Sequence, residues 1–216
     1  MPHFFFFNDT PYPIEYDPNS KLRAAITCIE QNHSLVAQRA LEVIHSDKVT
    51  INSFFELSKT DYLSLRTVME ENYQVKIPLA FPPSSSVIKQ IEYRLDGIVF
   101  NKKNIYLKSN RNPAEIARTL VHEIAHVLNK SLFNEDLLTN NPKLARYKDE
   151  IRSFTAEKRF ERNDRCLLRS DVKKIHQTVT ERYAHLMTPE TSSELGYIAA
   201  SYDSPSEETS DHMSLG

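Results

Sequence analysis

The ten residues from Thr119 to Leu128 constrain the fold of this chain more than any other stretch. They read Thr-Leu-Val-His-Glu-Ile-Ala-His-Val-Leu. In a helix, residues four apart lie one turn apart on the same face, so His122 and His126 can direct two imidazoles at one point. The other positions are nearly all apolar, which predicts a buried helix. Two buried imidazoles and the carboxylate of Glu123 need partners there.

A metal ion is the partner that this spacing predicts. Two neutral imidazole nitrogens on a rigid helix suit Zn2+, and zinc-bound water is acidic enough to supply hydroxide near neutral pH. Glu123 follows His122 directly and can accept the proton of such a water. The alternative is an ordinary helix with two surface histidines, and the apolar flanks weigh against it. We therefore expect His122 and His126 to be metal ligands and Glu123 to be the catalytic base.

A third metal ligand must come from further along the chain, because no third histidine follows at a short spacing. Glu150 and Glu157 are seven residues apart, which places them two turns apart on one face of an expected helix. Either can complete the metal site, and the other can accept a hydrogen bond from a ligand histidine. An earlier pair, Glu135 and Asp136, is expected in a solvated loop. Asp149 is a further acidic candidate.

Composition indicates an ordinary globular chain without a nucleic-acid-binding charge. The 216 residues are 40% hydrophobic and carry a net charge of -2, enough for one domain with a core and no argument for nucleic-acid partners. The two cysteines, Cys28 and Cys166, have no CxxC partner, as expected for free thiols in a reducing compartment. No apolar run has transmembrane length and no signal peptide is recognisable. We expect a soluble, cytosolic-type protein, or one exported without a cleaved signal.

Three blocks are expected along the chain. Residues 1–77 form an aromatic, proline-containing arm and a helical block, in which Ser34 caps one helix, Ser53 opens a capping box, and Thr60 or Asp61 begins another helix. Residues 78–200 begin with a break rich in proline and serine, at 78–86, and contain the metal site. Residues 201–216 form an acidic tail expected to be disordered. The first two blocks can form one compact unit.

The second block is expected to combine a hairpin with helices. Ile98–Phe100 and Ile105–Leu107, with a polar loop between them, predict a β-hairpin. The segment 87–93 fits either a strand or a helix. The chain as a whole is therefore predicted to be α+β and mainly helical, with a small antiparallel sheet packed on the helix of His122. The expected helices of this block cover approximately residues 113–130, 143–162 and 170–187.

These motifs resemble a known group of enzymes. Thr119 to Leu128 matches the extended zincin signature position by position. With a later glutamate on a helix, the chain resembles the gluzincins, in which two histidines and a glutamate bind the metal. Glu-Ile-Arg-Ser-Phe-Thr-Ala-Glu at 150–157 is similar to the ligand helix of ImmA/IrrE-type metallopeptidases, approximately Glu-Ala-Asn-x-Phe-Ala-Ala-Glu, where the first glutamate binds the metal. The resemblance covers roughly residues 105–160 and implies a zincin-like core with Glu150 as third ligand.

The resemblance also implies an activity, that of a zinc endopeptidase acting on a protein or peptide. The strand Ile105–Leu107 is then expected to pair with an extended substrate. A non-catalytic regulatory or binding protein on a zincin scaffold is the alternative, and the intact Glu123 favours the enzyme. The oligomeric state is not predicted. The candidates for a group that stabilises the tetrahedral oxyanion are Tyr147, His176, Tyr183 and His185.

The C-terminal tail resembles the tails of substrates of bacterial type IV secretion, such as Legionella effectors. It has paired glutamates among serines and threonines, followed by Met213 and Leu215. This resemblance implies translocation into a host cell and cleavage of a host protein in the host cytosol. A simple acidic, disordered end is the alternative explanation.

Overall fold

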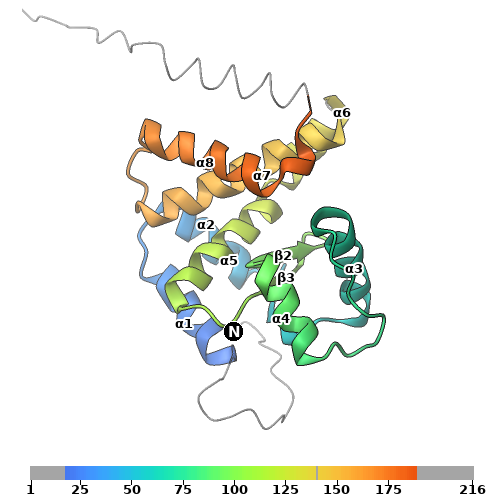
Figure 1. Cartoon of the computed structure of the whole chain (residues 1–216). Coiled ribbons are helices and arrows are strands. Elements are labelled where there is room, and N and C mark those ends of the chain that lie inside the picture. The colour runs from blue at the N-terminus through green and yellow to red at the C-terminus, as the bar shows by residue number, and fades with distance from the viewer. Residues whose placement is uncertain (1–17, 140, 189–216) are drawn as a thin grey trace, which may run out of the picture.

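The computed structural model describes residues 18–139 and 141–188, and it is mainly helical with one small sheet (Figure 1). The predicted α+β, mainly helical fold class is therefore confirmed. The expectations for the N-terminal arm through residue 17 and for the acidic tail lie outside the described residues.

The first part of the chain contains two helices, a short strand and a third helix. Ser34 caps the second helix, and its side chain accepts a hydrogen bond from the Ala37 N–H, as predicted. The Ser53 capping box is also present. The third helix begins earlier than expected, because the Ser58 side chain accepts from the Asp61 N–H and so caps it. The elements are α1 (Pro18–Glu30), α2 (Leu35–His45), β1 (Thr50–Ser53), a 3-10 turn η1 (Phe54–Glu56) and α3 (Lys59–Tyr73).

The middle of the chain contains a helix, the predicted hairpin and the helix of the two histidines. The ambiguous segment 87–93 is helical, because Ser84 caps it and its apolar residues are buried at helical spacing. The hairpin turn is one residue shorter than expected, and Asn101 and Lys102 adopt positive φ values of 53° and 52° within it. These elements are α4 (Ser85–Arg94), β2 (Gly97–Phe100), β3 (Asn104–Leu107) and α5 (Pro113–Leu128).

The last part of the chain is helical, including a stretch expected to be a loop. Glu135 and Asp136 lie in a helix, and Asp136 is buried with its Oδ2 2.7 Å from Nη1 of Arg152. The expected final helix is also shorter, because it ends before Tyr183 and a 3-10 turn follows. These elements are α6 (Lys130–Thr139), α7 (Pro142–Glu161), α8 (Arg169–Arg182) and η2 (Ala184–Leu186).

The sheet is mixed and not purely antiparallel, which corrects the prediction. Its strand order is β1-β3-β2, with β1 parallel and β2 antiparallel to β3. The central strand Ile105–Leu107 is therefore hydrogen-bonded on both sides and cannot pair with a substrate, so that expectation is wrong. Within the described residues, β1 and β2 are the edge strands of this sheet, and β2 lines a cavity that also contains the two histidines.

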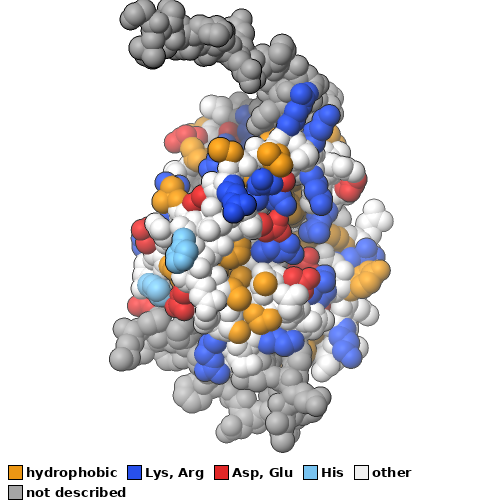
Figure 2. Space-filling model, turned by 90° about the vertical axis from the view of Figure 1, so that its left-hand side faces the viewer, with side chains coloured by type: hydrophobic (Ala, Val, Ile, Leu, Met, Phe, Trp, Pro, Cys, Tyr) orange, Lys and Arg blue, Asp and Glu red, His pale blue; other side chains and the backbone are white. Residues whose placement is uncertain are grey.

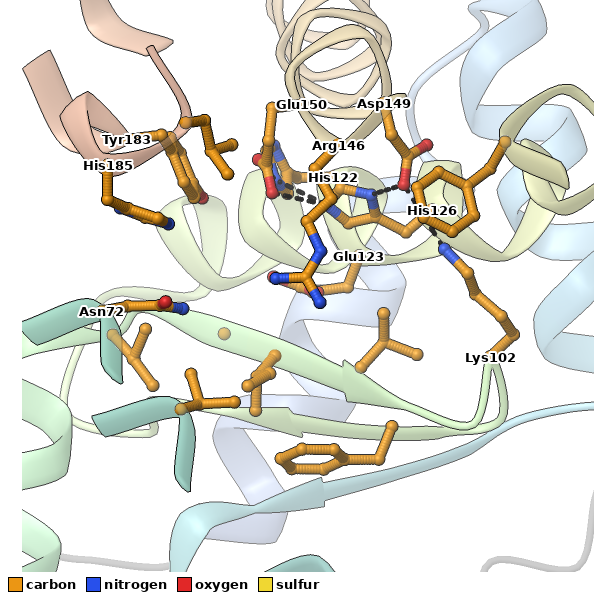
Figure 3. Close-up of a pocket in the computed structure, with 18 of the residues that line it drawn as sticks. Asn72, Lys102, His122, Glu123, His126, Arg146, Asp149, Glu150, Tyr183 and His185 are labelled. Atoms are coloured by element: carbon orange, nitrogen blue, oxygen red, sulfur yellow. Dashed lines mark hydrogen bonds and ion pairs between the residues drawn. The ribbon is translucent and has the colours of Figure 1, made fainter. Parts of the chain in front are cut away.

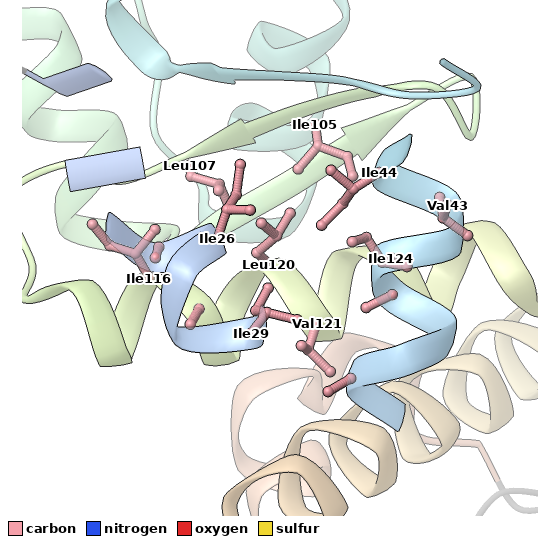
Figure 4. Close-up of a cluster of buried hydrophobic side chains, with 14 of the residues drawn as sticks. Ile26, Ile29, Val43, Ile44, Ile105, Leu107, Ile116, Leu120, Val121 and Ile124 are labelled. Carbon is pink, nitrogen blue, oxygen red and sulfur yellow. The ribbon is translucent and has the colours of Figure 1, made fainter. Parts of the chain in front are cut away.

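One hydrophobic core joins segments from both sides of the proline-rich break. Ile29 of α1 and Ile44 of α2 pack with Ile105 of β3 and with Leu120 and Ile124 of α5 (Figure 4). Burial of each such aliphatic side chain contributes about 1.5–3 kcal/mol relative to exposure. This packing holds the apolar face of α5 and turns its opposite, histidine-bearing face toward α7.

A buried polar cluster attaches α3 to the other face of the sheet. Tyr106 of β3 donates a 2.8 Å hydrogen bond to Oδ2 of Asp61, and Asn104 donates to the same oxygen at 2.9 Å. The backbone N–H of Ser58 donates to the Tyr106 hydroxyl at 3.3 Å. Because Asp61 is buried, these donors compensate for the water that its carboxylate has lost.

The described surface carries mixed charge. On the face shown in Figure 2, Lys and Arg side chains gather toward the centre and one side, with Asp and Glu among them. Cys28 and Cys166 are both free, as expected. Within residues 18–139 and 141–188, every helix is too short or too polar to cross a lipid bilayer.

The Tyr106–Asp61 contact provides a test of the fold. We expect Tyr106→Phe to lower the free energy of unfolding by about 1–3 kcal/mol, because it removes a donor from a buried carboxylate. Urea denaturation measures this change. Tyr93→Phe is the matched control, since Tyr93 is 79% exposed, and it should change stability by less than about 0.5 kcal/mol. Equal effects of the two substitutions would contradict the proposed role of the cluster.

Candidate metal centre

The start of α5 is set by a capping box. The Asn112 side chain accepts from the Glu115 N–H at 2.9 Å, and a Glu115 carboxylate oxygen accepts from the Asn112 N–H at 3.2 Å. Pro113 occupies the first turn, where its missing N–H costs nothing. Further along this helix, His122, Glu123 and His126 are all buried, with the two histidines against α7 and Glu123 against Gly97 of β2.

Helix α7 supplies a carboxylate to the same point. One potential ligand atom from each of His122, His126 and Glu150 lies within 4.8 Å of the others, a group that could hold a metal ion (Figure 3). The two histidine Nε2 atoms are 3.2 Å apart. Oε2 of Glu150 lies 3.5 Å from Nε2 of His122, and its Oε1 lies 3.8 Å from Nε2 of His126.

These distances fit the coordination shell of a small divalent ion. Two zinc–nitrogen bonds of about 2.0–2.1 Å at a tetrahedral angle place their nitrogens about 3.3 Å apart. The observed Nε2–Nε2 separation is 3.2 Å. In addition, Oε2 of Glu150 is buried without a hydrogen-bond partner in the described part of the chain. A metal ion would satisfy both the facing nitrogen lone pairs and this carboxylate oxygen.

Other side chains of α7 hold the two imidazole rings in place. Oδ2 of Asp149 lies 2.8 Å from Nδ1 of His126, and Oγ of Ser153 lies 3.1 Å from the same nitrogen. Oε2 of Glu157 lies 3.4 Å from Nδ1 of His122. A proton on each Nδ1 leaves each Nε2 free to bind a metal, because neutral imidazole carries only one ring proton.

The geometry separates the roles of the two glutamates that the sequence left open. Glu150 approaches the Nε2 atoms, whereas Glu157 approaches the opposite nitrogen of His122. Asp149 orients the His126 ring, whereas the sequence indicated it only as a candidate metal ligand. Its spacing of four from Ser153, on the same helical face, was the signal that could have identified it.

The hairpin turn also reaches the metal centre. Nζ of Lys102 lies 3.3 Å from Oδ2 of Asp149 and 5.0 Å from the centre of the Phe133 ring. Lys102 therefore links the hairpin to the carboxylate that contacts His126. No sequence signal identified it, because its position depends on the left-handed backbone of the turn.

The electrostatics of the site favour a cation between the helices. Burial lowers the pKa of His122, but the carboxylates of Glu150 and Glu157 beside it outweigh burial and raise this pKa to about 10. Burial raises the pKa of Glu123, and the neighbouring histidines only partly offset this rise. Burial also raises the pKa of Tyr183 well above its usual value, and the Glu150 carboxylate adds to the effect, so its hydroxyl stays protonated.

A cavity of about 340 Å³ opens beside these residues, and all of β2 lines it. Gly97 is needed for this close approach, because a Cβ there would lie 2.8 Å from Cγ2 of Thr119 and 2.9 Å from Oε1 of Glu123. Lys108 N donates to Asp96 O at 2.9 Å. Because bonded and non-bonded pairs alternate in an antiparallel ladder, the N–H and C=O groups of Gly97 and Val99 face the open edge.

Two of the four candidate oxyanion donors line the cavity. Tyr183 and His185 lie at its wall, near Glu150 (Figure 3). Tyr147 and His176 are not among the described lining residues, and the Tyr147 hydroxyl lies 3.1 Å from Nδ1 of His176 instead. Arg146, which also lines the cavity, was missed because a single arginine on a charged helix carries no distinguishing sequence signal.

Comparisons of this chain with protein-family models, curated proteins and solved structures found no match. Its chemistry must therefore be inferred from the site itself.

The separate positions of Glu150 and Glu157 can be tested by metal content. We expect Glu150→Ala to lose stoichiometric zinc after dialysis, because it removes one of three ligands. Glu157→Ala should still bind zinc, with an affinity lower by about 10–100-fold, because it removes only an orienting contact. Mass spectrometry of bound metal and competition with a zinc chelator measure these values.

Glu135→Ala is the matched control, since Glu135 is an exposed acid on α6 and should not alter zinc binding. Loss of zinc in Glu157→Ala with full retention in Glu150→Ala would reverse the two assignments.

Proposed function

We propose that this protein is a zinc-dependent endopeptidase that hydrolyses peptide bonds in a protein substrate. The observation that carries the proposal is the convergence of His122, His126 and Glu150 beside the buried carboxylate of Glu123. Three protein ligands leave a tetrahedral metal one position for water, as catalytic zinc sites require.

The residues of the centre divide the chemistry between them. Zinc held by His122, His126 and Glu150 would lower the pKa of a water molecule and polarise the scissile carbonyl group. Glu123 would serve as the general base that accepts a proton from the attacking water and as the general acid that gives it to the leaving amine. Asp149 and Glu157 hold the ligand imidazoles in orientation.

The open edge of β2 is the proposed substrate-aligning element, in place of the central strand expected from the sequence. An extended peptide can add to this edge through the backbone groups of Gly97 and Val99. Because the position of Gly97 lies against Glu123, a peptide bond aligned there would reach the catalytic base. The Tyr183 hydroxyl, at the cavity wall, is the favoured donor to the oxyanion.

Two further parts of the proposal rest on sequence. The acidic tail supports secretion from a bacterium and a substrate in the host cytosol, and this tail lies outside the described residues. The alternative function is a non-catalytic binding or regulatory protein on the same scaffold. The retention of Glu123 next to an intact ligand set supports catalysis, because binding alone does not require a base.

Replacement of the base provides the test of activity. We expect Glu123→Gln, which keeps the shape of the side chain, to bind zinc normally and to cleave at least about 10²-fold more slowly, because the proton acceptor is lost. Cell lysate is treated with each zinc-loaded protein, and new protein N-termini are identified by mass spectrometry.

Glu135→Gln serves as the control and should produce the same new N-termini as the wild type. A wild-type protein that produces no N-termini beyond those of Glu123→Gln would support the non-catalytic alternative and contradict the endopeptidase.

A further inference from the structure

The cavity beside the metal centre continues into a second hollow of about 440 Å³ at the start of β2. The two share Gly97, His122, Glu123 and Tyr183 among their lining residues. Together they form a cleft that passes the metal-binding group, with one end beyond Gly97 and the other beyond Phe100.

The end beyond Gly97 contains a local excess of positive charge. The Asp96 carboxylate forms ion pairs with three cations. The nitrogen–oxygen distances are 3.9 Å to Lys108, 3.4 Å to Arg111 and 3.9 Å to Arg182. A fourth cation, Arg94, has no carboxylate partner among the described residues, and its guanidinium lies 5.2 Å from the centre of the Tyr93 ring. Arg111 also lies 3.7 Å from a second carboxylate, that of Glu115. The hollow as a whole is lined by five cations, these four and Arg118, and by three carboxylates, those of Asp96, Glu123 and Glu157.

The opposite end of the cleft is different in character. Val68, Ile98, Phe100 and Phe133 supply apolar surface there. Two cations, Lys102 and Arg146, also line this cavity, but three carboxylates, those of Glu123, Asp149 and Glu150, line it with them, and Asp149 lies 3.3 Å from Lys102. The cleft therefore distinguishes its two ends by charge, which gives it a basis for selecting the sequence and direction of a bound peptide.

We propose that the basic end of the cleft, formed by Arg94, Lys108, Arg111 and Arg182, binds an anionic side chain of the peptide substrate. This inference rests on the proposed endopeptidase function. A strand advances about 3.3 Å per residue, so a peptide paired with β2 reaches the basic end about two or three residues from the bond over Glu123. Aspartate and glutamate have the required charge, and a phosphorylated residue presents the same chemistry.

A peptide is favoured over a nucleic acid as the anionic ligand. The basic end adjoins Glu123 and an open strand edge, which recognises an extended polypeptide backbone. The chain as a whole carries a net charge of -2, so the four cations are a local feature and not part of a basic surface suited to many phosphates.

The experiment compares two double charge reversals in the full chain loaded with zinc. Arg94→Glu with Arg182→Glu alters the basic end through two exposed side chains. Lys173→Glu with Lys174→Glu is the control, with the same change in net charge on exposed positions of α8. The probe is a library of peptides made by chymotrypsin digestion of a cell lysate, and mass spectrometry identifies the cleaved bonds.

We expect wild type and control to prefer Asp or Glu two or three residues from the cleaved bond, on one side only. The Arg94→Glu, Arg182→Glu protein should lose this preference and cleave the acidic peptides about tenfold more slowly, an effect that weakens at high salt. Synthetic versions of the best peptide, with glutamate, glutamine or phosphoserine at that position, then distinguish a carboxylate from a phosphate ligand.

A binding measurement separates this inference from the proposed function. Immobilised, zinc-loaded Glu123→Gln protein should retain the same acidic peptides, and the added reversals should release them. Retention without any cleavage by the wild type would support anion binding at the basic end and overturn the endopeptidase. Cleavage without a preference for acidic residues would overturn anion binding at the basic end alone. Absence of both, or binding of a single-stranded oligonucleotide in place of acidic peptides, would also overturn the inference.

Discussion

The contact between α5 and α7 is the interaction on which the rest of this structure depends. Helix α5 carries two imidazoles and a carboxylate into a buried position, and such groups are costly without partners. Helix α7 supplies the partners of the two imidazoles, with Asp149, Glu150 and Glu157 placed along the matching face. The apolar packing of α1 and α2 on the other side of α5 fixes its rotation, so that the polar face must meet α7.

The elements with a strong periodic or capping pattern could be predicted from the sequence. The helix of His122 and His126, the hairpin before it and the helix of Glu150 were all recognisable, and the ligand candidates came together in the structure. The strand Thr50–Ser53 was missed because four residues carry too little alternation, and its pairing with β3 is a long-range contact. The helix 130–139 was missed because its apolar residues do not form a clear stripe, and its buried Asp136 is stabilised by a distant arginine.

The main correction concerns the element that would align a substrate. The sequence identified a hairpin but could not show which of its strands becomes central, because that depends on a third strand from residues 50–53. The structure leaves β2 open and packs Gly97 directly against Thr119 and Glu123. The short segment Asp96–Phe100 thus supplies the open strand edge, lies against the base and runs between the two ends of the cleft, which connects the fold to both proposals.

X-ray absorption at the zinc edge tests the central claim most directly. Protein reconstituted with one equivalent of zinc should show a shell of nitrogen and oxygen ligands at about 2.0–2.2 Å, with the outer-shell scattering of two imidazoles. Wild-type protein with this spectrum would support a centre made by His122, His126 and Glu150. A sulfur ligand at about 2.3 Å, or a shell without imidazole scattering, would contradict it.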